Sequence, residues 1–409
     1  MDIEEIASQL RRGTRGLVPE KGLEEKLAKS AKTNRPLTIK LGLDPTAPDI
    51  HLGSAVVLRK LRQFQDLGHN VVIIIGDFTA MIGDPSGRNE TRPQLTEEEI
   101  KANAATYANQ YHKILDAQKT QIRFNSEWLG KFSFADVIRL ASHATVARTM
   151  ERDDFTKRFK EGLSIGLHEL LYPLCQAYDS VVLKADIEMG GTDQMFNILA
   201  GRDLQREYGQ EPQVALFMPL LTGLDGAHKM SKSLGNTIGI TEPPNDMYGK
   251  LMSISDDLLP EYLELCTDIP VDEIAQMIKG IREDRINPKD VKRKLASEVV
   301  TIYYGREAAL AADAEFERVH SAHQNPNEMP EVKIQSTEKP TIWICRLLVD
   351  AGLAKGTGEA RRLVEQGGIT INGERIDRAD AELPLGQIGG AVLRAGKNRF
   401  LRIKLSSSR

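Results

Sequence analysis

With 409 residues, 41% of them hydrophobic and 27% charged, and a formal net charge of −4, the chain has the composition of an ordinary globular protein with two or three domains. Cys175, Cys266 and Cys345 lie far apart without a CxxC pair, so we expect neither disulfides nor zinc and place the protein in the reducing cytoplasm. Residues 1–32 are charged and amphipathic, and no run of 18 apolar residues occurs, which argues against export and a membrane span.

The first third of the chain predicts a parallel α/β unit. Residues 1–35 fit one or two helices without chemistry of their own. Apolar residues alternate over 37–43, as in a half-buried strand, and Asp44-Pro45 ends the run. Helical spacing follows over 52–67, and 71–75 predicts a second buried strand. A strand, loop, helix and strand in this order are typical of a nucleotide-binding sheet, whose ligands lie beyond the carboxyl ends of the strands.

The loop and first helical turn after the first strand hold small and polar residues, namely Asp44, Thr46, His51, Gly53 and Ser54. The N-terminus of a helix attracts anions through its free N–H groups and its dipole, so this turn is a candidate phosphate site. Neither the Walker pattern nor the glycine-rich dinucleotide pattern occurs here. Taken alone, His51 fits a helix cap better than a catalytic group.

Two segments after the second strand are less specific. Residues 77–87 predict a loop at the strand's carboxyl end, where Asp84 is either a ligand-binding carboxylate or a turn residue. Residues 125–170 are mostly helical in pattern and carry a broad apolar surface, which in the simplest reading covers the sheet.

Tyr172, Gln176 and Asp179 are spaced i, i+4 and i+7, so on a helix they project from one face. An aromatic stripe with this spacing usually belongs to a core. Burying an unpaired Gln and Asp is costly, however, so a binding surface is the better interpretation.

Residues 181–187 alternate like a strand and lead into Gly190-Gly-Thr-Asp-Gln194. Paired glycines permit close approach of a ligand, and Asp193 is suited to ribose hydroxyls, although a tight turn alone also explains the segment. Residues 213–221 predict the last strand. Lys229-Met-Ser-Lys-Ser233 then offers two lysines and two hydroxyls to a polyphosphate, with a solvated charge run as the alternative.

The remainder predicts helices at 243–323, whose alternating charges fit a solvated surface, then a polar linker and a small tail of two helices and short strands. Residues 341–409 carry 12 Lys and Arg against 7 Asp and Glu, a net +5, which leaves −9 for the rest of the chain. The tail is therefore the favoured place for a phosphate backbone, with a protein-docking module as the alternative.

With HLGS at 51–54 and KMSKS at 229–233 in this order, the sequence resembles the class I aminoacyl-tRNA synthetases, and more closely the bacterial tyrosyl-tRNA synthetases, over nearly the whole chain. The resemblance implies an α/β protein with a Rossmann-like parallel-sheet catalytic domain and a small α+β S4-like domain. The implied division is a catalytic domain at 1–240 with its connective insertion at about 125–170, an α-helical anticodon-arm domain at 241–325, a linker at 326–340 and the S4-like RNA-binding domain at 341–409.

The same resemblance implies that a cytoplasmic homodimer, joined through the insertion, activates L-tyrosine with Mg²⁺-ATP and transfers it to the 3′-terminal ribose of tRNA(Tyr). The implied catalytic residues are Thr46, His51, Lys229, Lys232 and Ser233. The residues implied to contact ATP are Asp44, His51, Gly53, Ser54, Asp193, Met230 and Lys232. Those implied to bind tyrosine are Thr79, Asp84, Tyr172, Gln176, Asp179 and Gln194, and Arg361 and Arg362 would meet RNA.

Two departures from the family pattern bear on these roles. Lys40 stands where many members have a Tyr that contacts the substrate phenol, and Ser54 stands where the usual motif ends in His. Two other functions also remain open at this stage. A tryptophanyl-tRNA synthetase shares both motifs, and a non-catalytic RNA-binding protein on a synthetase scaffold would retain the basic tail.

Overall fold

The structure is a computed structural model that describes residues 2–43, 50–84, 96, 99, 110–320, 329–335, 340–396 and 399–406. Asp44 and Thr46 lie outside these residues, as does the end of the predicted loop at 77–87. The chain folds as two compact units, 1–310 and 311–409. No helix in the described part of the chain is long and apolar enough to cross a membrane.

The first unit is built on a six-stranded sheet with the order β1-β6-β5-β2-β3-β4. All neighbouring strands are parallel except β1, which pairs antiparallel with β6. The strands are β1 (Gly16–Val18), β2 (Thr38–Leu43), β3 (Asn70–Ile75), β4 (Thr120–Phe124), β5 (Ile187–Gly191) and β6 (Val214–Met218). The strand β1 was not predicted, because three residues between two helices carry too little alternation to reveal a strand.

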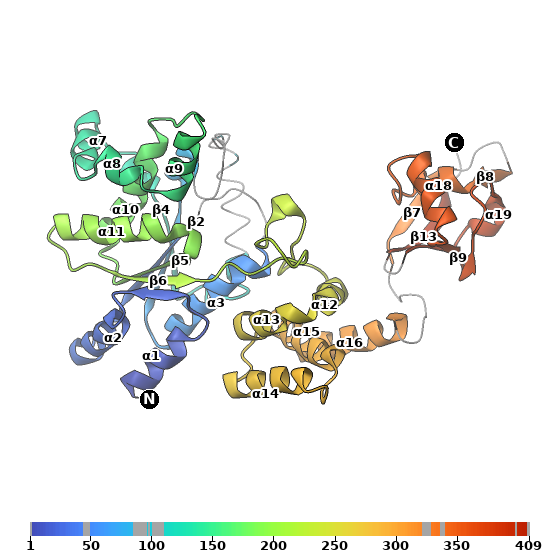
Figure 1. The fold of residues 1–409 in the computed structure, drawn as a ribbon, viewed down its shortest axis with the longest axis horizontal. Helices are drawn as coiled ribbons and strands as arrows, with labels where there is room; N and C mark the ends of the chain where they lie inside the picture. Colours follow the sequence, from blue (N-terminus) through green and yellow to red (C-terminus); the bar gives the residue numbers. More distant parts are fainter. Residues whose placement is uncertain are drawn as a thin grey trace. The chain divides into compact units, whose positions relative to one another are not determined.

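Helices cover both faces of this sheet. Helices α10 and α11 lie side by side on one face, and α3 lies on the other (Figure 1). The helices of this part are α1 (Ile3–Arg11), α2 (Gly22–Thr33), α3 (Leu52–Asp66), α4 (Asp77–Ile82), α10 (Tyr172–Leu183) and α11 (Met195–Glu207). Because both faces are covered, β2 is not half-buried as predicted, and even the side chain of Lys40 is fully buried under α10.

Two local predictions were wrong. Residues 77–82 form the short helix α4 rather than a loop. Residues 181–183 continue α10, which ends at Leu183 and is followed by its C-cap Lys184 in the left-handed region (φ 48°), so β5 begins only at Ile187. A run of three apolar residues before a left-handed cap fits the last turn of a helix as well as the start of a strand, and packing of α10 on the sheet decides between them.

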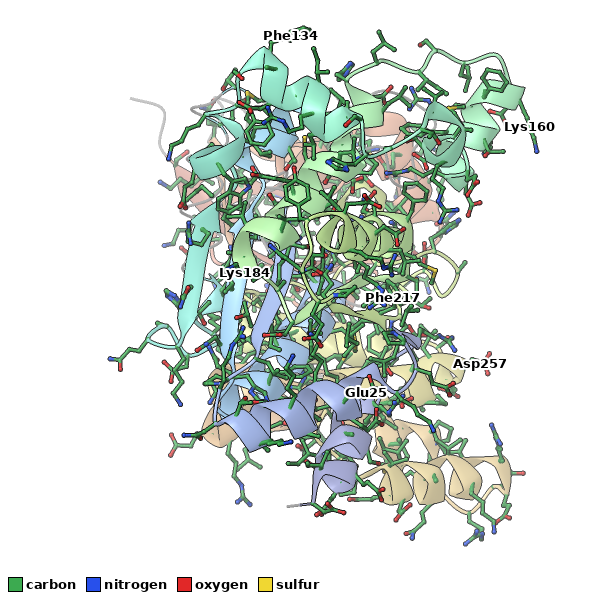
Figure 2. The ribbon with its side chains drawn as sticks, turned by 90° about the vertical axis from the view of Figure 1, so that its left-hand side faces the viewer. Glu25, Phe134, Lys160, Lys184, Phe217 and Asp257 are labelled. Atoms are coloured by element: carbon green, nitrogen blue, oxygen red, sulfur yellow. The ribbon has the colours of Figure 1, made fainter. Side chains whose placement is uncertain are left out.

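The insertion between β4 and α10 is helical, as expected. Its helices are α6 (Ser126–Leu129), α7 (Phe134–Ala141), α8 (Val146–Thr149) and α9 (Asp153–Lys160), followed by the 3-10 turn η1 (Glu169–Leu171). In Figure 2, Phe134 and Lys160 lie at the end of the unit away from Glu25 of α2. Several large apolar side chains of this end are exposed, namely Phe134, Ile138, Val146, Phe159, Leu163 and Leu167.

A helical bundle follows the sheet. Its helices are α12 (Pro244–Ser253), α13 (Leu259–Cys266), α14 (Val271–Arg282) and α15 (Pro288–Tyr304). The next helix, α16 (Arg306–His320), contains the boundary of the two units. Helix α13 packs against α3 as well as against α14 and α15. The bundle therefore supports the helix whose first turn carries the HLGS motif.

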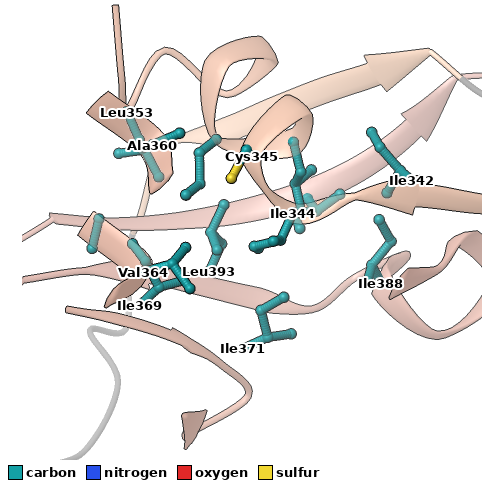
Figure 3. Close-up of a cluster of buried hydrophobic side chains, with 14 of the residues drawn as sticks. Ile342, Ile344, Cys345, Leu353, Ala360, Val364, Ile369, Ile371, Ile388 and Leu393 are labelled. Carbon is teal, nitrogen blue, oxygen red and sulfur yellow. The ribbon is translucent and has the colours of Figure 1, made fainter. Parts of the chain in front are cut away.

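The second unit is a small α+β fold. Its five-stranded sheet has the order β10-β9-β12-β13-β7, and β8 and β11 pair separately. Buried side chains such as Ile344, Val364, Ile369 and Leu393 fill the core (Figure 3). The elements are β7 (Glu331–Gln335), β8 (Thr341–Trp343), α17 (Ile344–Asp350), α18 (Thr357–Glu365), β9 (Ile369–Ile371), β10 (Glu374–Arg375), β11 (Glu382–Pro384), α19 (Leu385–Ile388), β12 (Val392–Ala395) and β13 (Arg399–Ser406).

Within the range 326–340, expected to link the domains, β7 pairs in parallel with β13. Part of that range thus belongs to the second unit's sheet. The sequence hides this strand because polar residues flank a single buried position, Ile334.

Candidate active site

A cleft of about 370 Å³ lies beyond the carboxyl ends of β2, β3 and β5. Chain order reverses between β2 and β5, which is where ligands bind in open parallel sheets, and the volume suits a small organic ligand. Twelve of the predicted site residues line it: His51, Gly53, Ser54, Thr79, Asp84, Tyr172, Gln176, Asp179, Asp193, Gln194, Lys229 and Met230.

His51 forms the N-cap of α3. The backbone N–H of Ser54 donates to Nδ1 of His51 across 3.3 Å, which leaves Nε2 to carry the ring proton. Burial is the main cause, and the positive charge of Lys232 the second, of a pKa of His51 lowered to about 4. The imidazole is therefore neutral near pH 7, with Nε2–H able to donate a hydrogen bond.

The segment after the KMSKS loop is hydrogen-bonded to the start of α3. The N–H of Leu52 donates to the carbonyl of Ile238 across 2.9 Å, and the N–H of Ile240 donates to the carbonyl of Ile50 across 3.0 Å. A Cβ atom at Gly53 would lie 3.1 Å from the His51 ring and 3.4 Å from Met230 Cβ. Glycine at this position thus lets the KMSKS loop approach the helix N-terminus closely.

The KMSKS loop, residues 229–233, stands at the end of a tight turn after β6. The N–H of Met230 donates to the carbonyl of Leu221 across 2.7 Å. The carboxylate of Glu261, on α13, accepts from the N–H and the hydroxyl of Thr222 at 2.7 and 3.0 Å. These bonds fix the base of the loop to the helical bundle.

Of the two lysines of this loop, Lys229 lines the cleft and Lys232 does not. Nζ of Lys229 lies 3.1 Å from Oδ2 of Asp193, in the turn after β5. The influence of Lys232 on the pKa of His51 places that ammonium group near the imidazole. Ser233 does not line the cleft, but its hydroxyl lies 2.9 Å from that of Ser231, which does.

Asp179, on α10, lines the cleft and is buried. Its Oδ1 accepts from the indole N–H of Trp128 across 2.8 Å, and its Oδ2 accepts from Nδ2 of Asn125 across 3.5 Å. Burial raises the pKa of this carboxyl to about 7, although the charge of Lys40 and the bond from Trp128 oppose the shift. Asp179 is thus a buried acceptor that titrates near neutral pH.

Lys40 does not line the cleft. Its ammonium group lies 3.0 Å from Oε1 of Glu188 and donates to the carbonyl of Gln176 across 3.0 Å and to Oγ of Ser180 across 2.8 Å. The side chain of Lys40 therefore lies under α10, outside the cleft. The hydrogen-bond partners of Asp179 come instead from the end of β4 and from α6.

Other predicted residues are joined across the cleft. Nε2 of Gln194 donates to Oδ2 of Asp84 across 3.0 Å, which connects the end of η2 (Thr192–Gln194) with the segment after α4. Thr79 accepts from Nδ2 of Asn125 across 3.1 Å. Arg361 and Arg362 lie exposed on α18 in the second unit.

Sequence reasoning missed three residues of the site. Asn125 directly follows β4, so a polar side chain at the carboxyl end of a parallel strand was the available signal. Trp128 was counted as part of an apolar surface, and nothing local reveals that its indole N–H meets Asp179. Asn236 accepts from the N–H of Ser231 across 2.8 Å and donates to the carbonyl of Lys229 across 3.2 Å, so it holds the KMSKS loop in shape.

Comparison with known proteins agrees with this geometry. Residues 32–321 match the family "tRNA synthetases class I (W and Y)", and residues 322–403 match the "Tyrosine--tRNA ligase SYY-like C-terminal domain". A tyrosine--tRNA ligase of Moorella thermoacetica is 56% identical over 403 residues, 98% of this chain and 96% of that protein. One of Haemophilus influenzae is 52% identical over 405 residues, 99% of this chain and 98% of that protein.

Solved structures show the same fold. A tyrosyl-tRNA synthetase of Archaeoglobus fulgidus, complexed with L-tyrosine, superposes with a TM-score of 0.61 at 23% identity, over 76% of this chain and all of that one. A C-terminally truncated mitochondrial enzyme of Aspergillus nidulans superposes with a TM-score of 0.63 at 21% identity, over 78% of this chain and 94% of that one. The predicted α/β fold class is thus confirmed.

The comparisons also decide between the functions that the sequence left open. The first family model covers tryptophan and tyrosine enzymes alike, but the two relatives named above, each more than 50% identical over nearly the full length, are tyrosine--tRNA ligases. A full-length match to ligases at this identity likewise leaves no ground for a non-catalytic scaffold. The chain belongs to the tyrosine--tRNA ligase family of the class I aminoacyl-tRNA synthetases and is an aminoacyl-tRNA ligase.

Proposed function

We propose that the cleft binds L-tyrosine beside ATP, forms tyrosyl-adenylate and passes the tyrosyl group to the 3′-terminal ribose of tRNA(Tyr). The observation that carries this assignment is that one cleft is walled at one end by a helix N-terminus and the KMSKS loop, and at the other by buried carboxylate and amide groups. The first end suits a polyphosphate, and the second suits an amino acid with a polar side chain.

At the amino-acid end, Asp179 accepts the hydrogen bond of the substrate phenol. Its burial and its bond to Trp128 support this role, because a buried acceptor discriminates strongly against a substrate that lacks the matching hydroxyl. Tyrosyl-tRNA synthetases are themselves the known example of such discrimination, which reaches about 10⁵ for tyrosine over phenylalanine. Tyr172, Gln176 and Asp84 receive the α-ammonium group, and Thr79 and Gln194 complete this end.

At the phosphate end, the tyrosine carboxylate attacks the α-phosphorus in line, and pyrophosphate leaves. No covalent bond to the protein forms, so the catalyst works by positioning and by charge. Neutral His51 donates from Nε2 to an oxygen of the pentacoordinate phosphorus centre, and Thr46 assists it. Lys229, Lys232 and Ser233 stabilise the charge that builds up on the leaving pyrophosphate.

The remaining ATP contacts follow the walls of the cleft. Asp193 accepts from the ribose hydroxyls once ATP displaces its ion pair with Lys229, and Gly53 allows the nucleotide to approach the first turn of α3. Ser54 replaces the usual His of the motif with a hydroxyl that donates to a ribose or phosphate oxygen. Asp44 and Met230 complete the nucleotide site.

Mg²⁺ enters with ATP as the metal of the substrate. Among the residues that the structure describes, no group of three His, Cys, Asp or Glu side chains is arranged to hold a metal ion. The phosphate end instead presents lysines and hydroxyls, which fits an ion held mainly by phosphate oxygens and water. When bound, Mg²⁺ neutralises part of the phosphate charge, and the protein residues position the reacting groups.

The second unit contacts tRNA through Arg361 and Arg362. Both side chains are exposed on α18, and the surrounding tail carries a net positive charge, as phosphate contacts require. The helices α12 to α16 meet the anticodon arm. We place this activity in the cytoplasm, where the three buried cysteines remain free thiols.

The insertion joins two copies of the chain. Phe134 is 80% exposed and Phe159 is 71% exposed, and Val146 and Leu167 share the same end of the unit. So many large apolar side chains are rarely left exposed to water. In a twofold contact, the same surface of a second copy covers them.

An ATP–pyrophosphate exchange assay with each amino acid in turn tests this function. We expect exchange with tyrosine and background exchange with tryptophan, and we expect His51→Ala to lower the tyrosine rate at least about tenfold. Exchange driven by tryptophan, or by no amino acid, would contradict the proposal.

A further inference from the structure

A buried polar cluster lies behind α10, outside the cleft. Lys40 of β2 and Glu188 of β5 are neighbours in register across the parallel strands, and both side chains point under α10. Their exposed fractions are 0% and 1%, and Nζ lies 3.0 Å from Oε1. Gly201 of α11 closes the cluster, because a Cβ atom there would meet Gln213 Nε2 at 2.7 Å and Glu188 Oε2 at 3.1 Å.

The Glu188 carboxylate accepts from four donors. Oε1 accepts from Lys40 and from Nε2 of Gln176, the latter across 3.1 Å. Oε2 accepts from the hydroxyl of Ser180 across 2.9 Å and from Nε2 of Gln213. A carboxylate offers only acceptor oxygens, so the amide of Gln176 has to turn its NH₂ group, and not its oxygen, toward Glu188.

This contact fixes the amide of Gln176 in one of its two orientations. Because Nε2 is bound to Glu188, Oε1 is the amide atom left for the cleft that Gln176 lines. Lys40 also donates to the main-chain carbonyl of Gln176, so the residue is held at both its backbone and its side chain. An oxygen facing the cleft attracts a cation, whereas an NH₂ group in its place would repel one.

We propose that the buried pair Lys40–Glu188 is a positioning device that presents the oxygen of Gln176 to the α-ammonium group of the substrate. This inference rests on the proposed role of Gln176 in the amino-acid site. Lys40 acts through Glu188, because its ammonium group holds in place Oε1, the oxygen that accepts from Gln176. The pair therefore sets the affinity for the amino end of tyrosine and leaves recognition of the phenol to Asp179.

The decisive variant is Lys40→Met with Glu188→Gln, which removes both charges together and retains partners for Ser180 and Gln213. Without Lys40, the oxygen of the amide introduced at position 188 accepts from Nε2 of Gln213, and its NH₂ group faces Gln176. That NH₂ group donates to Oε1 of Gln176, so the amide of Gln176 reverses and turns its own NH₂ group toward the cleft. We expect the KM for tyrosine in exchange to rise about tenfold with kcat little changed. In Glu188→Gln alone, Lys40 remains and holds the new amide oxygen on the side of Gln176, so Gln176 keeps its orientation. The KM of this variant for tyrosine should stay within about threefold of that of the parent.

A probe that lacks the amino group separates positioning from a general loss of structure. The probe is 3-(4-hydroxyphenyl)propionate, measured as a competitive inhibitor against tyrosine. Its inhibition constant should change less than about twofold in the double variant, since it has no ammonium group for Gln176 to contact. The matched control is Arg158→Met with Glu169→Gln, which neutralises a buried pair of 2.9 Å in the insertion and should leave both constants unchanged.

Gln176→Met distinguishes failure of this inference from failure of the proposed function. If Gln176→Met weakens tyrosine but spares the probe, while the double variant binds both as the parent does, the positioning role is wrong and the amino-acid site stands. If Gln176→Met leaves tyrosine affinity intact, Gln176 does not bind the ammonium group, and the proposed site itself is wrong. Equal weakening of tyrosine and the probe in the double variant also overturns the positioning role.

Discussion

Nζ of Lys229 and Oδ2 of Asp193 lie 3.1 Å apart, so an ion pair connects the KMSKS loop with the turn after β5 across the cleft. The side chains are 46% and 27% exposed, and ion pairs this accessible contribute only about 0–1 kcal/mol to stability. Replacing Lys229 therefore removes a charge from the phosphate end without unfolding the protein.

Lys229→Ala and Lys232→Ala should each slow adenylate formation at least about tenfold, because their charges act mainly on the pyrophosphate as it leaves. Tyrosine affinity, measured by equilibrium dialysis, should stay close to that of the parent. Lys119→Ala, which removes an exposed lysine before β4, is the control for loss of charge. If tyrosine binding fell as much as the rate, the phosphate role would be wrong.

The tyrosine-to-phenylalanine ratio of kcat/KM should fall as the pH drops below about 7. Burial raises the pKa of Asp179 to about 7, so the free enzyme gains a proton there as the pH falls and loses the charged acceptor for the phenol. Phenylalanine has no phenol and should respond less. Trp128→Phe removes a bond that lowers this pKa, so it should move the inflection to higher pH. A ratio that is flat from about pH 6 to 8 would contradict this assignment.

Arg361→Ala with Arg362→Ala should raise the KM for tRNA several-fold while exchange with tyrosine stays unchanged. Each lost phosphate contact should also make tRNA binding less dependent on salt. The slope of log K for binding against the logarithm of the salt concentration should become shallower by about 0.7 to 0.9 per contact. Arg378→Ala is the matched control, since this exposed arginine of the same unit pairs with Asp380. An unchanged KM for tRNA in the double variant would exclude α18 from the interface.

Phe134→Asp with Phe159→Asp should convert a dimer into monomers, because four buried charges would then face each other across a twofold contact. Sedimentation velocity measures the mass directly. Val271→Asp, at an apolar and exposed position at the start of α14, should leave the mass unchanged. A parent chain that sediments as a monomer would contradict dimerisation through the insertion.

The sequence predicted the main elements of the sheet because they carry strong local signals. Alternation before Asp44, helical spacing from Leu52 and the apolar run at 71–75 correspond to β2, α3 and β3. The end of α10 and the strands β1 and β7 were not found, since each depends on neighbours distant in the sequence. β1 forms only because β6 lies beside it, and β7 only because β13 does.

The sequence revealed the residues of the candidate site that belong to contiguous motifs. It did not reveal the residues that form hydrogen bonds with those motif residues. Lys40 illustrates the limit. Its sequence position suggested the phenol end, whereas in the fold it faces Glu188, which is 148 positions away in the chain. Only the register of β2 with β5 brings the two side chains together, and no local pattern encodes that register.

Selection of tyrosine by Asp179 is tested most directly by Asp179→Asn. The change keeps the size and one acceptor oxygen but removes the carboxylate, and a hydrogen bond to a charged group contributes about 1.5–3 kcal/mol. When kcat/KM is measured for both amino acids in exchange, tyrosine's advantage over phenylalanine should shrink roughly 10- to 100-fold. An unchanged ratio in Asp179→Asn would falsify the phenol-binding role.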